Sequence, residues 1–165
     1  MIIYEEIFRD FQKNKVKYVV VGGIAFNLHG ALRNTADLDI LVEMSDENLG
    51  KIVRILTKRG YQVRQPVDPM KIADSKTRKI WVHEKNMKAF NFYKDGELKE
   101  VDIIIASPVS YETAAKQSIP FKAAQLTIHL ISIDHLIKMK KKAGRPIDKL
   151  DVAELKQIKR LRGKK

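Results

Sequence analysis

The sequence contains no cysteine among its 165 residues, so disulfides, thiolate metal sites and cysteine nucleophiles are all excluded. It also lacks a long hydrophobic run. The stretch Val101–Ala106 is interrupted by Asp102 and is far shorter than the roughly 20 residues of a membrane-spanning helix. The N-terminal segment MIIYEEIFRD carries acids where a signal peptide would carry bases. From these absences we expect a cytoplasmic protein with no membrane partner.

Acidic residues are scarce relative to basic ones. The chain has 32 Lys and Arg against 20 Asp and Glu, which gives a formal net charge of +12. Such an excess attracts phosphate-rich partners through its summed field and through counterion release. A lysine-rich, cysteine-free composition is also common in proteins of heat-adapted organisms, in which many lysines simply face solvent. The charge therefore allows a nucleic-acid surface without requiring one.

The remaining composition is that of a folded protein. Hydrophobic residues make up 44% and charged residues 32% of the chain, and a chain of this length suits one domain with one core. We therefore expect a single domain over residues 1–165. Two C-terminal helices at residues 132–161 should pack on it, followed by a basic tail at residues 159–165.

Hydrophobic periodicity and turn residues predict alternating helices and strands. This alternation favours a mixed α/β (α+β) fold, in which helices pack on one mixed β-sheet. The segment 66–77, with prolines and scattered charges, is expected to be a loop. The expected helices cover residues 2–13, 24–29, 45–59, 108–117, 132–143 and 146–161, and the expected strands cover residues 18–21, 38–43, 61–65, 80–84, 87–93, 98–105 and 126–130.

The first predicted strand runs directly into Gly22 and Gly23. A strand that turns into a helix through glycines exposes backbone N–H groups, and the helix dipole there favours an anion such as a triphosphate. The alternative is a tight turn that needs glycine only for its backbone angles. The pattern matches neither a dinucleotide-binding fingerprint nor a Walker A loop, because the next glycine is Gly30 and no Gly-Lys-Ser/Thr occurs.

Two aspartates, Asp37 and Asp39, open the second predicted strand with Leu38 between them. Side chains two apart in a strand point to the same face and lie about 6.7 Å apart at the usual rise. Both carboxylates could therefore bind one hard cation or a pair of them. The alternative is an ordinary strand end with two solvated acids.

A third carboxylate, Asp102, lies in the apolar stretch KEVDIII. An acid inside such a strand needs a partner or a metal to be tolerated, although Glu100 or Asp102 could also face solvent. In a two-metal site, one ion binds a triphosphate and the other helps to deprotonate the attacking hydroxyl. The third acid would serve that second role.

These residues together resemble a known superfamily. The run Gly22-Gly23, thirteen residues, Asp37-x-Asp39 and a later strand aspartate is similar to the pattern of polymerase-beta-like nucleotidyltransferases. The finer text GGIAFNLHGALRNTADLDILVE, together with DHLIKMKKKAGRPIDKLDVAEL near the C-terminus, resembles the minimal nucleotidyltransferases grouped with abortive-infection, type IV toxin-like enzymes. The two blocks cover both ends of the chain, whereas residues 61–100 match nothing recognisable.

The resemblance implies a nucleotidyltransferase fold and transfer of NMP from an NTP to a hydroxyl, with Mg²⁺ and release of pyrophosphate. It assigns the triphosphate to Gly22 and Gly23, and two Mg²⁺ ions to the catalytic acids Asp37, Asp39 and Asp102. Relatives often carry serine at the position of Gly23. Its absence here removes one side-chain donor and leaves the backbone to contact phosphate.

Four further residues are candidates for nucleotide binding: Arg33, Thr35, Lys140 and Arg145. Arg33 and Thr35 precede the acids, where an arginine could contact phosphate or form a structural salt bridge to Asp37 or Asp39. Lys140 and Arg145 could reach the triphosphate from the C-terminal block. Alternatively, the lysines of this block form a solvated helix face.

Some polar residues are expected to be structural. His29 lies near the end of a predicted helix, before Gly30, and is interpreted as a helix-end residue rather than a base. Asp148 and Asp151 should pair with Arg145 or a neighbouring lysine. We expect them opposite an apolar stripe of the last helix, formed by Ile147, Leu150 and Ile158.

Three functions remain open at this point. The first is a metal-dependent nucleotidyltransferase that uses an NTP and acts on RNA such as tRNA, or on a protein, with a protein antitoxin as a possible partner. The positive charge makes RNA the first choice of acceptor. The second is a catalytically silent module of the same fold that binds nucleic acid or a partner protein. The third is aminoglycoside-like modification of a small molecule, which the basic charge disfavours because a cationic acceptor needs an acidic pocket.

Overall fold

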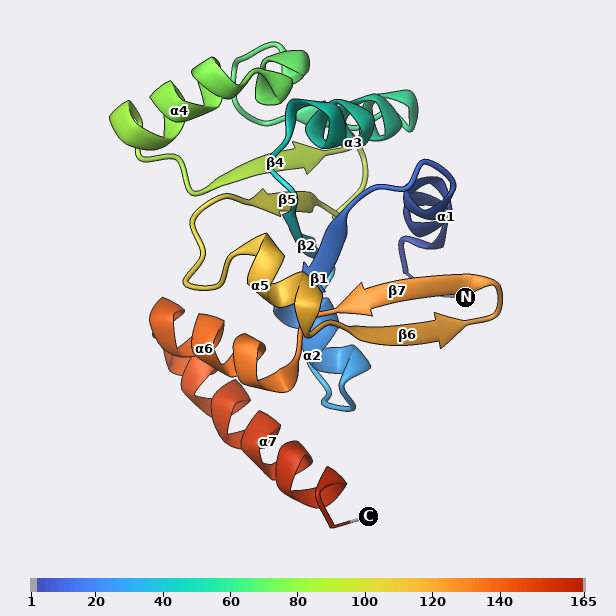
Figure 1. Cartoon of the computed structure of the whole chain (residues 1–165), viewed down its shortest axis with the longest axis vertical. Helices are drawn as coiled ribbons and strands as arrows, with labels where there is room; N and C mark the ends of the chain where they lie inside the picture. Colours follow the sequence, from blue (N-terminus) through green and yellow to red (C-terminus); the bar gives the residue numbers. More distant parts are fainter. Residues whose placement is uncertain (1–2, 165) are drawn as a thin grey trace.

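The computed structural model of the chain describes residues 3–164. Seven strands form one sheet in the order β3-β4-β5-β2-β1-β7-β6, and helices pack around it (Figure 1). The strands are β1 Tyr18–Val21, β2 Leu38–Val42, β3 Gln62–Val63, β4 Ala89–Tyr93, β5 Val101–Ile104, β6 Ile119–Ala123 and β7 Leu126–Leu130. The helices are α1 Glu5–Lys13, α2 Gly22–Leu28, α3 Asp46–Lys58, the 3-10 helix η1 Pro69–Ala73, α4 Ser75–Glu84, α5 Tyr111–Lys116, α6 Ile133–Ala143 and α7 Pro146–Arg162.

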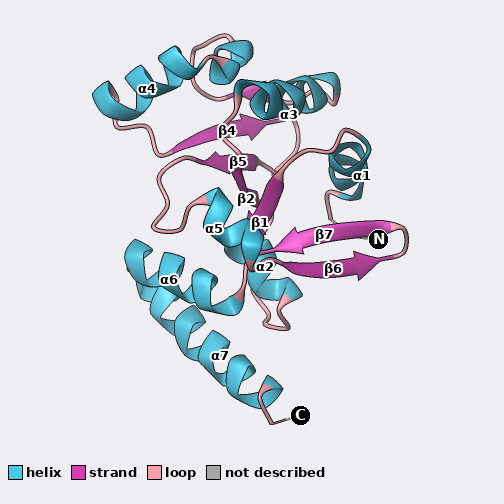
Figure 2. Cartoon of the chain, viewed as in Figure 1, coloured by secondary structure: helices cyan, strands magenta, loops and turns pink. Residues whose placement is uncertain are grey.

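The sheet is mixed, as the sequence predicted. Strand β2 pairs in parallel with β5, and β1 pairs in parallel with β7. The other neighbours, β1 with β2, β3 with β4, β4 with β5 and β6 with β7, are antiparallel. Figure 2 shows these strands in magenta, with β2 and β1 at the centre of the molecule. The functional candidates lie on these central strands.

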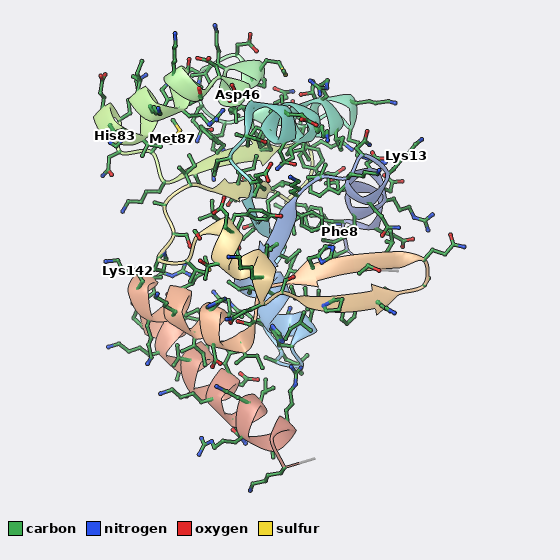
Figure 3. The ribbon with its side chains drawn as sticks, viewed as in Figure 1. Phe8, Lys13, Asp46, His83, Met87 and Lys142 are labelled. Carbon is green, nitrogen blue, oxygen red and sulfur yellow. The ribbon has the colours of Figure 1, made fainter. Side chains whose placement is uncertain are left out.

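One side of the sheet, here called the apolar face, forms most of the core. The aromatic rings of Phe8 and Phe11 from α1 pack on Tyr18 of β1, with ring centroids 6.0 and 5.1 Å apart. Phe8 lies on the sheet side of α1, whereas Lys13 lies on its outer side (Figure 3). The apolar face consists of Tyr18, Val20, Leu38, Ile40, Val42, Phe90, Phe92, Val101 and Ile103, all of them buried.

The opposite side of the central strands, here called the polar face, carries Asp39, Asp102 and Asn91. These three residues are direct neighbours across β2, β5 and β4. Because side chains alternate along a strand, the same strands can bury one set of residues and present the other. Helices α6 and α7 lie together at the lower end of Figure 1, and Lys140 of α6 lies 5.2 Å from the ring of Phe26 on α2. The polar face is therefore where chemistry can take place.

The largest departure from the sequence prediction lies in residues 66–84. The expected loop at 66–77 and the expected strand at 80–84 are instead the 3-10 helix η1 and helix α4. The Asp74 side chain starts α4 by accepting a 2.9 Å hydrogen bond from the Thr77 backbone N–H. Burial of Trp81 against Phe90 of β4 then holds the helix to the apolar face. The prediction was wrong because this tertiary contact outweighs the β-branched character of the segment.

Other differences are smaller. Strand β6 was not predicted, because Pro120 interrupts its pattern; the strand lies at the edge of the sheet, where a missing N–H is tolerated. Helix α2 begins at Gly22 rather than at residue 24. Helix α1 begins at Glu5, whereas the expected start at residue 2 lies outside the described part of the chain. The last residues of α7 include 159–162 of the expected basic tail.

Helix α7 buries both of its acids and only part of the expected apolar stripe. Its buried residues are Asp148, Asp151, Val152 and Leu155. Ile147 and Leu150 are 41% and 68% exposed, whereas Ile158 is partly buried against the core. The acids turn inward because buried or partly buried cations meet them there, as described below. Within residues 3–164, no helix has the length and apolar character needed to cross a membrane.

Two leucines of α7 provide a matched test of this orientation. Leu155 is fully buried and Leu150 is 68% exposed. We predict that Leu155→Ala lowers the free energy of unfolding by about 2–5 kcal/mol, because it leaves a cavity. Leu150→Ala should change it by less than about 0.5 kcal/mol. Urea denaturation of both variants measures the difference, and equal losses would contradict the orientation of α7.

Candidate active site

The glycine corner packs directly against the acids. Gly22 has φ +65°, and a Cβ on it would lie 2.0 Å from Oδ2 of Asp39. A Cβ on Gly23 would lie 2.7 Å from Oγ1 of Thr35. Both positions therefore exclude a side chain, and Gly22 also needs its left-handed backbone angle. The backbone at the end of β1 therefore packs directly against the side chains of Asp39 and Thr35.

Two of the three predicted acids share the polar face, and the third lies next to them in the chain. Asp39 and Asp102 are paired in the parallel register of β2 and β5, so their side chains point to the same side of the sheet. Asp37 lies two residues before Asp39, just before the start of β2. Its Oδ1 accepts a 3.3 Å hydrogen bond from the backbone N–H of Glu100, which precedes β5. Sequence positions 37, 39 and 102 are thereby brought together by one strand pairing.

Asp39 lies in an environment that disfavours its ionised form. Burial raises the pKa of Asp39 to about 7, and the carboxylates of Asp102 and Asp37 act in the same direction. The cations Arg145 and Lys140 oppose this increase without cancelling it. Burial also raises the pKa of Asp102. Ionisation of these acids is therefore costly unless a cation binds beside them.

A divalent cation is the chemical group that these acids fit. It would relieve the repulsion between them, and carboxylate oxygens are the ligands that Mg²⁺ prefers. Within residues 3–164, however, no three His, Cys, Asp or Glu side chains converge closely enough to hold an ion as they stand. Asp39 packs over Gly22, and Asp37 is bound to the Glu100 N–H. Side-chain rotation is therefore needed before the acids can share a metal.

Tyr4 anchors both acidic strands from outside the site. Its hydroxyl lies 2.5 Å from the carbonyl oxygen of Ala36 and 2.8 Å from that of Glu100. Ala36 immediately precedes Asp37, and Glu100 immediately precedes β5. The single hydroxyl hydrogen is shared between the two carbonyl acceptors, so Tyr4 links the two chain segments.

Two amides beside Asp102 were missed by the sequence analysis. Asn91 Nδ2 donates a 2.8 Å hydrogen bond to Asp102 Oδ1, and Gln65 Nε2 donates a 2.9 Å bond to Asn91 Oδ1. A signal existed in the alternation FNFY, which places Asn91 on the face opposite Phe90 and Phe92. It could not be used without the register between β4 and β5.

The predicted nucleotide-binding cations all pair with acids of α7. Arg33 and Lys140 both contact Oδ2 of Asp151, with the Lys140 ammonium at 2.5 Å. Arg145 forms a 2.8 Å ion pair with Asp148 through Nε, and its side chain is 64% exposed. Arg145 is therefore available to a ligand, whereas Lys140 is buried. Contact of these residues with nucleotide stays a prediction.

The acids of α7 are structural, as expected from the sequence. Although burial acts in the opposite direction, hydrogen bonds from Arg145 lower the pKa of Asp148 overall. Asp151 neutralises the two cations from the neighbouring loop and helix. His29 is also structural: it is 2% exposed, and its Nε2–H donates a 2.7 Å hydrogen bond to the Ile131 carbonyl. These residues fix α6 and α7 next to the site.

Solved structures of similar fold are nucleotidyltransferases. The lincomycin-bound lincosamide antibiotic adenylyltransferase LnuA is 18% identical, with a TM-score of 0.60 and coverage of 93% of this chain and 94% of its own. ANT(2'')-Ia in complex with adenylyl-2''-tobramycin is 17% identical, with a TM-score of 0.54 and coverage of 95% and 91%. An antigenic nucleotidyltransferase-like protein from Paracoccidioides brasiliensis is 12% identical, with a TM-score of 0.55 and coverage of 94% and 73%.

The fold and the arrangement of glycines and acids define a nucleotidyltransferase. The family model of aminoglycoside-2''-adenylyltransferases matches residues 4–155, so the chain belongs to that family. No curated protein sequence matches the chain. The superfamily inferred from the glycine and aspartate motifs is thus supported, whereas its toxin-like subtype is not.

A comparison of Gly22 with Gly96 distinguishes the effect of close packing from the effect of a positive φ, because both have positive φ and only Gly22 is closely packed. Gly96 has φ +78°, and a Cβ added to it would meet no atom within 4 Å, in contrast to one on Gly22. We predict that Gly96→Ala costs about 1 kcal/mol of unfolding free energy, from its backbone angle alone. Gly22→Ala should cost clearly more, because it must also displace Asp39. Urea denaturation measures both, and equal costs would contradict the close packing of Asp39.

The raised pKa of Asp39 has a consequence for stability. Between about pH 4 and pH 7 the folded chain retains a proton that the unfolded chain has released, so stability is lost as pH rises through about 7. We predict that Asp39→Asn raises the melting temperature at pH 8 in EDTA by several degrees, and that this gain shrinks toward pH 4. A variant that melts below the wild type at pH 8 would contradict the raised pKa of Asp39.

Proposed function

We propose that this protein transfers AMP from ATP to a hydroxyl group of a small molecule, using Mg²⁺ and releasing pyrophosphate. The observation that carries the proposal is the pairing of Asp39 with Asp102 against the Gly22 corner, in a chain of an adenylyltransferase family. All the residues of the predicted motif are present. A catalytically silent binding module, considered from the sequence, has no missing acid to motivate it.

Some residues of the site would bind the nucleotide, and others would bind the metal. The backbone N–H groups of Gly22 and Gly23 would face the triphosphate, with the exposed guanidinium of Arg145 as a side-chain donor. Asp37, Asp39 and Asp102 would hold Mg²⁺ once the side chains of Asp37 and Asp39 rotate toward Asp102. Bound Mg²⁺ would neutralise triphosphate charge and make the acceptor hydroxyl more acidic.

Asp102 is the group placed to accept a proton. Asn91 occupies Oδ1 of Asp102, which leaves Oδ2 for the acceptor. The acceptor oxygen attacks the α-phosphorus of ATP and forms a new P–O bond, while its proton moves to Asp102 Oδ2. The bond between the α-phosphorus and the bridging oxygen breaks, and pyrophosphate leaves with its electron pair.

The surface beyond Asp102 favours an acceptor with little positive charge. Glu100, two residues before Asp102, is paired with Arg64, whose guanidinium lies 5.0 Å from the centre of the Tyr93 ring. A polycationic aminoglycoside would need several carboxylates free to pair with its amines. We therefore propose a neutral or singly charged molecule with several hydroxyls, whose rings can pack near Tyr93.

The family changes the order of the acceptors expected from charge. RNA was the first choice and a small molecule the last, because the net charge of +12 disfavours a cationic acceptor. Of the three similar structures named above, one is a lincosamide antibiotic adenylyltransferase and another holds adenylyl-2''-tobramycin, which supports a small acceptor. Among small-molecule acceptors, the positive net charge then disfavours polycations. It is no longer an argument for RNA or for an antitoxin partner.

Binding of ATP with Mg²⁺ is the first test. We predict that Mg²⁺ and ATP together, at about 100-fold their Kd, raise the melting temperature by about 5–10 °C, and that neither does so alone. Asp39→Asn and Asp102→Asn should abolish the shift. Asp95→Asn, in the exposed turn between β4 and β5, is the control and should keep it. A shift that survives Asp39→Asn would contradict the assigned site.

The acceptor is tested with ATP labelled at its α-phosphate and three acceptors: lincomycin, tobramycin and tRNA. Label should appear on lincomycin in preference to tobramycin, because the acceptor surface has little uncompensated negative charge. Label on tRNA and on neither antibiotic would overturn a small-molecule acceptor. A preference for tobramycin would overturn only the charge argument.

A further inference from the structure

Asn91 belongs to the same row of the sheet as the acids. Cα pairing connects Asn91 on β4 to Asp102 on β5, and Asp102 to Asp39 on β2. The Asn91 side chain is therefore on the polar face, where Nδ2 donates to Asp102 Oδ1. An amide is not needed in this position for packing, because Phe90 and Phe92 provide the buried contacts of β4 on the other face.

A side-chain amide can act as donor or acceptor, depending on which way it is turned. Asn91 can donate to Asp102 only if its nitrogen faces that carboxylate. Gln65 determines this orientation, because its Nε2 donates to Asn91 Oδ1 at 2.9 Å. If Asn91 were turned over, two N–H₂ groups would face each other, and an amide oxygen would face the carboxylate.

Gln65 is itself held by the end of β3. The last backbone bond to β4 runs from the Arg64 N–H to the Asn91 carbonyl, at 2.9 Å, and Pro66 then has no N–H to continue pairing. The Gln65 amide takes over the edge of β4: it contacts the Ala89 carbonyl and the Asn91 N–H, both at 3.4 Å. The amide orientation is thus set by backbone groups, which cannot turn over.

We propose that Asn91 and Gln65 are positioning residues that fix Asp102 with Oδ1 occupied and Oδ2 directed to the reacting groups. This inference rests on the proposed function, since it assigns Asp102 to metal and acceptor. Residues that hydrogen-bond a metal-ligating carboxylate commonly contribute 10- to 100-fold to metal affinity or activity. The relay Gln65–Asn91–Asp102 is such an arrangement, built from strands β4 and β5 and a residue that follows β3 by two positions.

The test uses the full chain in the presence of ATP. It measures the Mg²⁺ concentration at which the rise in melting temperature reaches half of its maximum. Asn91→Ala removes the donor to Asp102. Gln65→Glu replaces the donor to Asn91 by an acceptor of the same size, which should turn the Asn91 amide over. We predict that each variant raises the half-saturating Mg²⁺ concentration by about 10- to 100-fold. The double variant should be no worse than the more severe single one, because both act through the same bond.

Gln62, three residues before Gln65, provides a matched control. Gln62 also lies beside β4, but its amide contacts Asp95 and Tyr93 rather than Asn91. Gln62→Glu introduces the same charge and should leave the Mg²⁺ dependence unchanged. Melting in EDTA, without nucleotide, verifies that each variant is folded.

The outcomes are distinguishable. If the wild type shows no joint stabilisation by Mg²⁺ and ATP, the proposed function and the positioning role are both overturned. If the wild type responds and Gln65→Glu behaves like Gln62→Glu, only the positioning role is overturned. Additive effects in the double variant, with the two single changes multiplying, would also overturn it, because a relay through one hydrogen bond cannot be lost twice.

Discussion

The parallel pairing of β2 with β5 places two carboxylates, Asp39 and Asp102, next to each other in a half-buried environment. Like charges so placed are unfavourable, and burial raises the pKa of both groups. A fold tolerates such repulsion where a ligand or metal compensates it. The residues around the two acids have one of two roles. Some hold the acids and their strands in position, and others place positive charge near them.

Support comes from opposite sides of the sheet. On one side, Tyr4 reaches from the start of α1 to the carbonyls that precede each acidic strand, so that the first helix sets the spacing of β2 and β5. On the other, Asn91 and Gln65 hold one oxygen of Asp102. The surrounding residues thus fix one carboxylate, whereas Asp37 and Asp39 must leave the Glu100 N–H and the Gly22 corner before they can bind a metal.

Limitation of the charge comes from α6 and α7. The Lys140 ammonium is buried between two α7 acids and lies 5.2 Å from the ring of Phe26, on α2. Removing either partner of such a buried pair would leave an uncompensated charge, which is costly. The cluster consequently joins the C-terminal helices to the helix that follows the glycine corner. It also leaves Arg145, at the start of α7, as the exposed cation next to the acids.

The sequence by itself determined the motif and the strands that carry it, because the apolar residues of β1, β2 and β5 and the spacing of glycines and aspartates are local properties of the chain. The class of reaction followed from the resemblance of that motif to the nucleotidyltransferases. It could not determine that residues 75–84 form a helix, since a contact between Trp81 and Phe90 decides this. Nor could it determine the inward face of α7, which depends on Arg33 and Lys140 meeting Asp151. Only the tertiary structure placed Asn91 beside Asp102, because a register between two strands is a long-range property that no single segment encodes.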